Sequence, residues 1–244
     1  MPTSPATPAP VSVSRRRPWP VEFYRSAVGK KWVMGITGIA LLGFVLAHMI
    51  GNLKVYLGDG QLDSYAHFLR ELLYPLLPKT VTLWLMRTGL VIAFLLHIHA
   101  AASLTLLNRR ANTAYRGPRD LAVASYASRT MRWSGVIVAV FLLWHLADLT
   151  WGVTPMAAEG WTPGAVEANL VASLSRGGVA VLYVVANLLL GIHIYHGAWS
   201  LFQSLGFAHP SYKRWRRWFA QAFSAAIVIG NVSIPIAVWT GMVG

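Results

Sequence analysis

Long apolar stretches alternate with shorter polar segments along most of this chain. The hydrocarbon core of a membrane is roughly 30 Å thick, so a helix needs about 20 mainly apolar residues to cross it. Five stretches meet this condition, at residues 32–53, 80–107, 133–153, 178–205 and 219–241. The pattern therefore predicts an all-α integral membrane protein with five transmembrane helices, the first four forming a bundle that the fifth covers.

The segments outside these spans differ in composition. Residues 1–24 are rich in Pro, Ser and Thr and contain no apolar run of the kind that a signal peptide has. We expect them to form a disordered cytoplasmic tail, followed by one membrane domain at residues 25–244. The connection at 54–79 is long and rich in aromatic residues, so we expect a short interfacial helix from about residue 62 to 74.

Composition agrees with this picture and restricts the chemistry. The chain is 55% apolar and 12% charged, whereas soluble proteins carry about a quarter charged residues. It contains no cysteine, which excludes disulfides, thiolate-bound iron–sulfur clusters and covalently attached c-type haem. Any redox cofactor in this chain must therefore be held without a thiol.

The formal charge of +13 is divided unevenly between the two sides of the membrane domain. Sixteen of the 21 Lys and Arg residues lie in the N-terminal segment, the loop after the second span and the loop before the fifth, and most acids lie on the other side. The positive-inside rule then places the N-terminus in the cytoplasm and the C-terminus outside. Membrane topology accounts for the charge, so no nucleic-acid partner is expected. The basic face could also dock an acidic soluble protein.

Each of the first four spans contains a histidine within its apolar run, namely His48, His97, His145 and His193. Ionisable side chains are costly inside a bilayer and commonly mark functional sites. With about 1.5 Å of rise per residue, His48 and His145 lie roughly 9 Å from the outer ends of their spans, whereas the other two fall in the inner half. We expect an outer pair and an inner pair about 15 Å apart.

Two imidazole pairs stacked across a membrane suit two b-type haems, because helix bundles hold such cofactors in their cores and imidazole ligation needs no covalent attachment. Two assignments stay open at this point. His97 and His99 face opposite sides of their helix, and His193 and His196 share one face. Spacing alone does not decide which member of each couple binds iron.

Several motifs make the chain similar to a known family. It resembles the cytochrome b subunit of succinate dehydrogenase and fumarate reductase, the b558-type membrane anchor with five helices and two haems. The resemblance covers about residues 24–241, and helix four is its most specific part. It rests on Ser26-x-x-Gly29-Lys30-Lys31, Gly38 through His48-Met49-x-Gly51-Asn52-Leu53, His97-Ile98-x-Ala100, Asn108-Arg109-Arg110-Ala111, Ser128-Arg129-x-Met131-Arg132-x-x-Gly135, His145, and His193-x-x-His196-Gly197-x-Trp199-Ser200-x-Phe202-Gln203-x-Leu205-Gly206.

The resemblance implies that His48 and His145 hold the outer haem iron, and that His97 and His193 hold the inner one. It implies a subunit of a succinate:quinone oxidoreductase in the bacterial cytoplasmic membrane. A flavoprotein subunit and an iron–sulfur subunit would dock on the cytoplasmic face. Electrons from succinate would reach a quinone, expected to be menaquinone, and this chain would not contain the succinate site.

The resemblance also suggests residues around the cofactors. Glu71 is the candidate for quinone protonation near the outer haem, with Asp148 as a second choice, although both fit ordinary outer-surface acids as well. The candidates for the inner-haem surroundings are His196, Arg129, Arg132, Lys30, Ser200 and Gln203. Basic residues at helix ends are equally typical of interface anchors.

Three alternatives remain for the function. One is the di-haem subunit of another quinone-linked dehydrogenase, such as a formate dehydrogenase or hydrogenase, against which the block Gln203-Ser204-Leu205-Gly206 argues. Another is a transporter with buried histidines, which is expected to show broken helices and internal repeats, and no repeat is evident. The third is a haem-free anchor, in which four depth-matched histidines would be surplus.

Overall fold

The computed structural model describes residues 18–58, 60–114, 121–207 and 209–244. Five helices in these ranges are long and apolar enough to cross a membrane, which confirms the predicted fold class. They are α2 (Ala27–Asn52), α4 (Val81–Ala114), α5 (Leu121–His145), α7 (Gly177–Ser204) and α8 (Lys213–Trp239). The described part of the chain contains no strand. The helices α2, α4, α5 and α8 begin or end several residues beyond the predicted apolar spans.

Shorter helical segments join these long helices. They are α1 (Trp19–Arg25), a 3-10 segment (Leu53–Leu57), α3 (Gln61–Glu71), a turn of π-helix (Leu146–Thr150), α6 (Val166–Leu174) and a second 3-10 turn (Pro210–Tyr212). The helix α3 lies within the region expected for an interfacial helix. Neither α6 nor the π-helical turn was expected from the sequence.

The predicted boundary of the N-terminal tail needs a correction. Residues 1–17 lie outside the described part of the chain, but residues 19–25 form α1. Proline in its first turn suits a helix start, where the missing N–H is not needed. The Tyr24 hydroxyl hydrogen-bonds to His99 Nδ1 at 2.5 Å, so α1 is attached to α4. Ser26 then caps α2 by accepting a hydrogen bond from Gly29 N.

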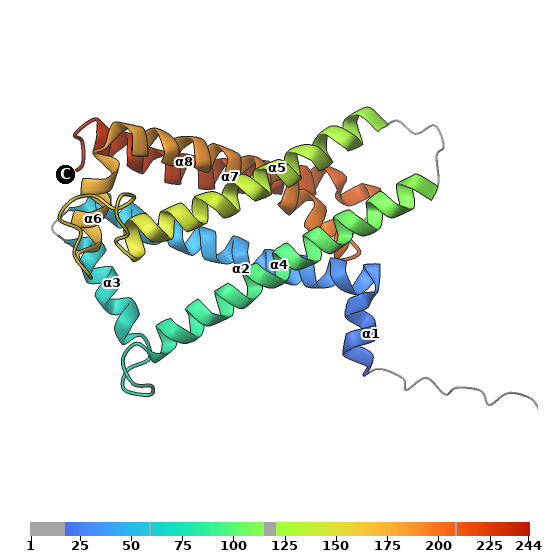
Figure 1. Cartoon of the computed structure of the whole chain (residues 1–244), viewed down its shortest axis with the longest axis horizontal. Coiled ribbons are helices and arrows are strands. Elements are labelled where there is room, and N and C mark those ends of the chain that lie inside the picture. The colour runs from blue at the N-terminus through green and yellow to red at the C-terminus, as the bar shows by residue number, and fades with distance from the viewer. Residues whose placement is uncertain (1–17, 59, 115–120, 208) are drawn as a thin grey trace, which may run out of the picture.

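Figure 1 shows how the two ends of the molecule differ. The helix α1, the C-terminal end of α4, the N-terminal end of α5 and the turn between α7 and α8 lie toward one end, which is the lysine- and arginine-rich end. The helices α3 and α6 and the C-terminus lie at the other. The carboxylate oxygen Asp63 Oδ1 accepts from Val166 N and Glu167 N, so α3 caps the first turn of α6.

The long helices pack in a chain of neighbours, with α4 along α2, α5 along α7, and α7 along α8. The helix α2 also touches α7 and α8. Close approach depends on small residues: Gly191 on α7 meets Val228, and Gly230 on α8 meets Met49 of α2. The fifth long helix α8 therefore covers α7 and reaches α2 as well.

Candidate functional site

The outer histidines come from α2 and α5 and lie side by side. The ring centroids of His48 and His145 are 5.9 Å apart, and the rings are nearly perpendicular. Phe44 stacks on His48 at 5.3 Å, and Phe141 flanks His145 at 5.9 Å. The pairing expected from depth is therefore present in the structure, whereas iron ligation by this pair stays a prediction.

The inner histidines come from α4 and α7, and each rests on the neighbouring helix. His97 lies against α2, where a Cβ on Gly38 would be 3.6 Å from His97 Cε1. His193 lies against α5, where a Cβ on Gly135 would be 3.1 Å from His193 Cε1. His99 points instead toward Tyr24 on α1, so His97 is the member of that couple that faces α2.

The two levels follow from these contacts. His97 lies at the level of Gly38, and His48 comes ten residues later on the same helix. His193 lies at the level of Gly135, and His145 again follows ten residues later. Ten residues of α-helix rise about 15 Å, which agrees with the separation predicted from the sequence.

These contacts also reveal an internal repeat that the sequence analysis missed. The dipeptide Thr37-Gly38 precedes His48 by the same interval as Ser134-Gly135 precedes His145. In both halves, the hydroxyl and the glycine receive the histidine of the following long helix. The signature is a Ser or Thr, a Gly, nine residues and a His. This signature is too short to be recognised in the sequence unless its contacts with the histidines are known.

Hydroxyl groups determine which ring nitrogen carries the proton in three of the histidines. Thr37 Oγ1 donates to Val33 O at 2.7 Å and lies 3.3 Å from His97 Nδ1. Ser134 Oγ donates to Met131 O at 3.1 Å and lies 3.3 Å from His193 Nδ1.

A hydroxyl has one proton, and here it is already directed at a carbonyl, so the oxygen must accept from the ring. Nδ1 of each inner histidine therefore carries the ring proton, and Nε2 keeps a lone pair for a metal.

The outer level follows the same rule at His145. Its Nδ1 lies 3.3 Å from the Tyr183 hydroxyl, which donates at 2.9 Å to a carboxylate oxygen of Asp148. A carboxylate only accepts, so the Tyr183 oxygen must accept from His145. Metal-binding histidines commonly donate their second N–H in this way.

Several buried donors without partners fit an acidic cofactor. Arg216 is 3% exposed, and its Nε and Nη1 have no hydrogen-bond partner. The buried indole nitrogens of Trp144 and Trp199 are also unpartnered. Buried N–H groups normally have acceptors, and the carboxylates of a haem are acceptors of this kind. The residues present at both levels therefore fit b-type haem. The sequence analysis missed all three, although Arg216 occupies the buried side of α8 that Ala220 and Ile227 continue.

The other candidates for the inner surroundings are more scattered. Ser200 lies seven residues after His193, on the same face of α7, and donates to Gly197 O. Lys30 donates to Arg25 O. Gln203, Arg129 and Arg132 are exposed. The two arginines are about 140° and 160° around α5 from Ser134, so they point away from His193. Their role stays a prediction.

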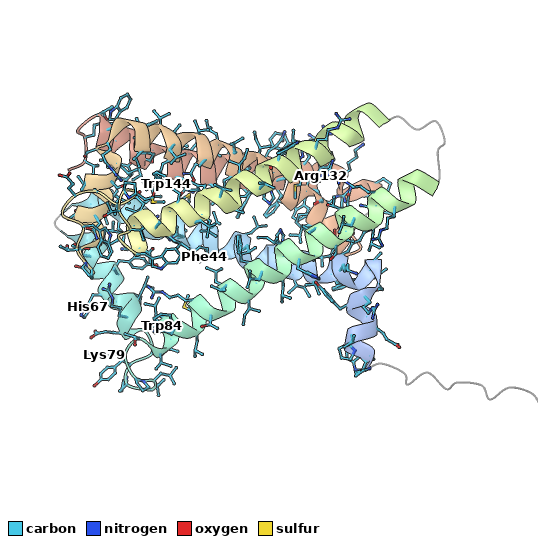
Figure 2. All side chains as sticks on the ribbon, viewed as in Figure 1. Phe44, His67, Lys79, Trp84, Arg132 and Trp144 are labelled. Atoms are coloured by element: carbon cyan, nitrogen blue, oxygen red, sulfur yellow. The ribbon has the colours of Figure 1, made fainter. Side chains whose placement is uncertain are left out.

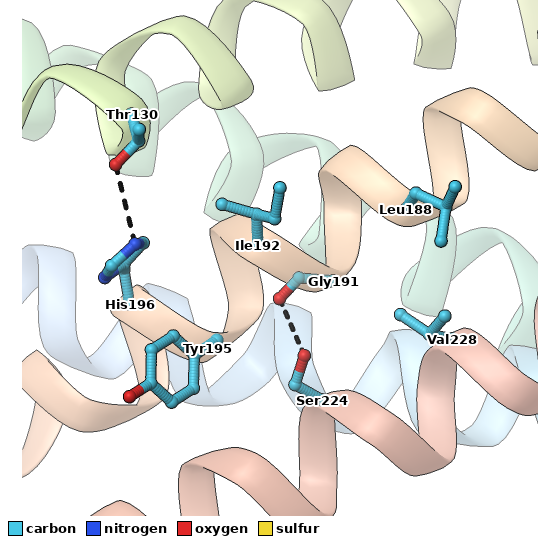
Figure 3. Close-up of a pocket in the computed structure, with 8 residues that line it drawn as sticks. All are labelled: Thr130, Leu188, Gly191, Ile192, Tyr195, His196, Ser224 and Val228. Carbon is cyan, nitrogen blue, oxygen red and sulfur yellow. Dashed lines mark hydrogen bonds between the residues drawn. The ribbon is translucent and has the colours of Figure 1, made fainter. Parts of the chain in front are cut away.

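His196 lies beside a cleft of about 390 Å³ between α5, α7 and α8. Figure 3 shows His196 reaching toward Thr130, with a distance of 3.5 Å between His196 Nε2 and Thr130 Oγ1. On the opposite side of the cleft, Ser224 Oγ donates to Gly191 O at 2.7 Å. The hydrogen bond to Thr130 joins His196 to the neighbouring helix α5, and its place in the inner-haem surroundings stays a prediction.

Glu71 lies at the corner between α3 and α4, where Figure 2 labels its neighbours His67 and Lys79. Lys79 Nζ donates to Glu71 Oε1, and His67 Nδ1 is 3.7 Å from Oε2. The hydrogen bond from Lys79 lowers the pKa of Glu71, and the charges of Lys79 and His67 lower it further, against a smaller opposing effect of burial. Among the interactions of the described residues, none joins Glu71 to the four histidines. Its assignment to quinone protonation stays a prediction.

Comparison with protein-family models, curated proteins and solved structures gives no match to this chain. Within the described ranges, no three His, Asp or Glu side chains gather around a common point suitable for a metal ion. The histidines come instead in twos.

Proposed function

We propose that this chain is a di-haem cytochrome b that anchors a succinate:quinone oxidoreductase in the bacterial cytoplasmic membrane. The observation that carries the proposal is the arrangement of four histidines, from four long helices, as two pairs at two depths. His48 and His145 would hold the outer iron and His97 and His193 the inner one, through imidazole nitrogens that suit b-type haem. The rings of the outer pair lie side by side, with centroids 5.9 Å apart.

When bound, the two haems would supply one-electron transfer between an iron–sulfur partner and a quinone. The chain's residues have four tasks in this arrangement. His48, His145, His97 and His193 ligate iron. Hydroxyl groups beside Nδ1 of three of the rings leave Nε2 as the nitrogen for iron. Gly135 makes room for the His193 ring. Arg216, Trp199 and Trp144 offer N–H groups to the acidic edges of the cofactors.

The basic end of the molecule supports the docking of soluble subunits. Exposed cations from α1, α2 and α8 gather there, namely Arg25, Lys31, Lys213, Arg214 and Arg217. The positive-inside rule assigns this end to the cytoplasm. A flavoprotein subunit and an iron–sulfur subunit with acidic surfaces would be attracted to it.

Quinone chemistry is assigned to the opposite end, with menaquinone as the expected species. Glu71 is the proposed proton-exchanging group because it lies at the outer surface, next to water. Its lowered pKa means that it is a carboxylate at neutral pH. It would therefore take up a proton from the medium before passing one to a reduced quinone, and the Lys79 contact would break in that step.

The di-haem subunit of a formate dehydrogenase or hydrogenase shares the geometry described above. The identity of the soluble partners separates the two functions. A transporter with buried histidines receives one supporting observation, the internal repeat, but α2, α4 and α7 carry their histidines on continuous helices, whereas transporter sites commonly use broken ones.

The proposal is tested by purifying the full complex through a tag on this chain and recording a reduced-minus-oxidised visible spectrum. We expect a b-type spectrum with about two haems per chain, a flavoprotein and an iron–sulfur protein in the same preparation, and reduction of a quinone analogue by succinate. A preparation without haem would falsify the proposal. Haem together with formate or hydrogen oxidation, and no succinate activity, would establish the alternative dehydrogenase.

The assignment within helix α7 is tested by two substitutions. His193→Ala is expected to lower the haem content from about two to about one per chain, because one of two axial ligands of the inner iron is lost. The matched variant His196→Ala is expected to keep both haems, because this side chain faces Thr130. The reverse result would assign iron ligation to His196.

A further inference from the structure

Asp148 is the most completely buried charged side chain in the described part of the molecule, with 0% exposure. Both carboxylate oxygens are occupied. Oδ1 accepts from Arg176 Nη2 at 3.0 Å, and Oδ2 accepts from Ser173 Oγ at 2.6 Å and from the Tyr183 hydroxyl at 2.9 Å. Arg176 also donates to the backbone carbonyls of Met156 and Ala157. The carboxylate is therefore fixed in position by three donors from two other segments.

The π-helical turn accounts for the position of Asp148. Trp151 N donates to Leu146 O at 2.8 Å, an interval of five residues where an α-helix would use four. Single turns of this kind are frequent at functional sites. The wider turn follows His145 directly, and both His145 and Asp148 contact the same Tyr183 hydroxyl on α7.

The hydrogen-bond directions are determined step by step. Asp148 can only accept, so the Tyr183 hydroxyl donates its proton to Asp148. The Tyr183 oxygen then has only acceptor capacity left for His145 Nδ1. The ring proton of His145 must therefore be on Nδ1. If Asp148 were neutral and able to donate, Tyr183 could turn its proton toward His145, and this constraint would be lost.

We propose that Asp148 is a positioning residue that acts through Tyr183 to fix the tautomer of His145 and, with it, the reduction potential of the outer haem. The effect on the His145 tautomer concerns the chain alone, whereas the effect on the reduction potential rests on the proposed function. A hydrogen bond accepted from the Nδ1 proton raises the basicity of the ligating nitrogen. A more basic ligand stabilises the oxidised iron, so the network lowers the potential of the outer haem relative to a ring without this partner.

The competing explanation is that the charge of Asp148 acts directly on the reduction potential of the outer haem, without Tyr183. Arg176 is paired with this carboxylate at 3.0 Å, so the two opposite charges largely cancel at a distance. The two explanations differ in the effect of combined substitutions. If Asp148 acts through Tyr183, removing both groups has the same effect as removing Tyr183 alone. If its charge acts directly, the two effects add.

The first measurement needs no cofactor. The full chain, labelled with 15N at histidine, is studied by NMR after chemical reduction, so that any low-spin haem iron is diamagnetic. The His145 signals are identified by their loss in His145→Gln. We expect a protonated Nδ1 and an unprotonated Nε2. In Tyr183→Phe and in Asp148→Asn, the Nδ1 proton should shift toward the position of a ring without a strong acceptor. A protonated Nε2 in the unmodified chain, or no change in both variants, overturns the proposal whether or not haem is bound.

The second measurement is a redox titration of the two haems in the complex. Tyr183→Phe and Asp148→Asn should each raise one midpoint, changing the ratio of reduced to oxidised haem about tenfold at a fixed potential, which is about 59 mV for one electron. The double variant should shift it no further than Tyr183→Phe does. Ser134→Ala, the matched control on the inner level, should shift the other midpoint, and Tyr195→Phe should shift neither. Additive shifts, or none, contradict the proposal, and absence of haem contradicts the proposed function alone.

Discussion

A histidine binds a metal only through a ring nitrogen that carries no proton, so the hydrogen bond at its other nitrogen decides its use. Three of the four histidines within the long helices meet a hydroxyl whose own proton is directed elsewhere. For His48, the described residues offer no hydrogen-bond partner, and Phe44 stacks on the ring instead. At residue scale, hydrogen bonding orients three of the proposed ligands and packing orients the fourth.

Glycine beside a histidine ring allows a matched pair of substitutions. Gly135→Ala would bring a Cβ to 3.1 Å from His193 Cε1, closer than ordinary contact, whereas Gly38→Ala would bring one to 3.6 Å from His97 Cε1. We expect Gly135→Ala to displace the His193 ring at a cost of about 1–3 kcal/mol and to broaden or shift the inner-haem spectrum. Gly38→Ala should leave the spectrum unchanged. Equal spectra for both variants would show that the site has more room than the distances indicate.

The ion pair between Glu71 and Lys79 makes the stability of the folded protein depend on pH, and the direction of this dependence can be predicted. Its pKa is lowered from 4.5 in the folded protein, chiefly by the hydrogen bond from Lys79. A carboxyl whose folded-state pKa is lowered contributes stability above its unfolded value, and loses it as the pH falls through the folded value. We expect Glu71→Gln to flatten the dependence of thermal unfolding on pH below 4.5. The effect should be small because the pair is exposed. Glu159→Gln, another outer-surface substitution, serves as the control, and an identical acid response in both variants would argue against the pair.

At element scale, the two halves of the bundle use the same device. The helices α2 and α5 each present a hydroxyl, a glycine and, ten residues later, a histidine, while α4 and α7 each contribute a histidine at the level of the glycine. The helices α2 and α5 run in the same direction across the membrane. The repeat explains why the histidines fall at two depths, because each half supplies one outer and one inner ring.

The contact between α7 and α8 depends on a close approach at Gly191. A Cβ at this position would overlap Val228, whose β-branched side chain has little rotational freedom. We expect Gly191→Ala to destabilise the folded chain by about 1–3 kcal/mol, seen as a lower thermal midpoint in detergent. Gly178→Ala, on the same helix, adds a Cβ with nothing within 4 Å and should be close to neutral. Equal midpoints would mean that α8 shifts away from α7 without cost.

At the scale of the whole molecule, the two ends differ in charge and in structure. One end carries the cations of α1, α2 and α8, and the other carries α3 and α6, which Asp63 joins. In Figure 2, Arg132 and Trp144 mark the two directions along α5, toward the basic end and toward the π-helical turn. Attraction of soluble subunits to one end and exchange of quinone near the other would give electron flow a direction across the bundle.

The absence of cysteine makes the orientation easy to measure. Single-cysteine variants at two exposed positions, Glu159→Cys near α6 and Ser211→Cys between α7 and α8, can be treated with a membrane-impermeant thiol reagent in intact cells. By the positive-inside rule, we expect labelling at position 159 in intact cells and at position 211 only after permeabilisation. The opposite pattern would reverse the orientation and place the proposed docking face outside.

The sequence by itself determined the five spans, the depth of each histidine and the division of charge between the ends. These are local properties, because hydropathy and a rise of about 1.5 Å per residue depend only on neighbouring positions. Spacing left His97 and His99 open and the resemblance favoured His97, whereas the different surroundings of the two rings required the packing of α4 against both α2 and α1. The hydroxyl partners required contacts between residues 60, 59 and 38 positions apart.

Only the tertiary structure decided the partners of Glu71 and Asp148, the first and second candidates for quinone protonation. The second is enclosed by Arg176, Ser173 and Tyr183, and the first is paired with Lys79 at the surface. The sequence also did not show that Arg216 is buried. The side of α8 that is buried depends on the packing of this helix against α7 and α2. The role of a polar side chain inside a membrane protein depends on the helix that packs against it. The sequence pattern does not show which helix that is.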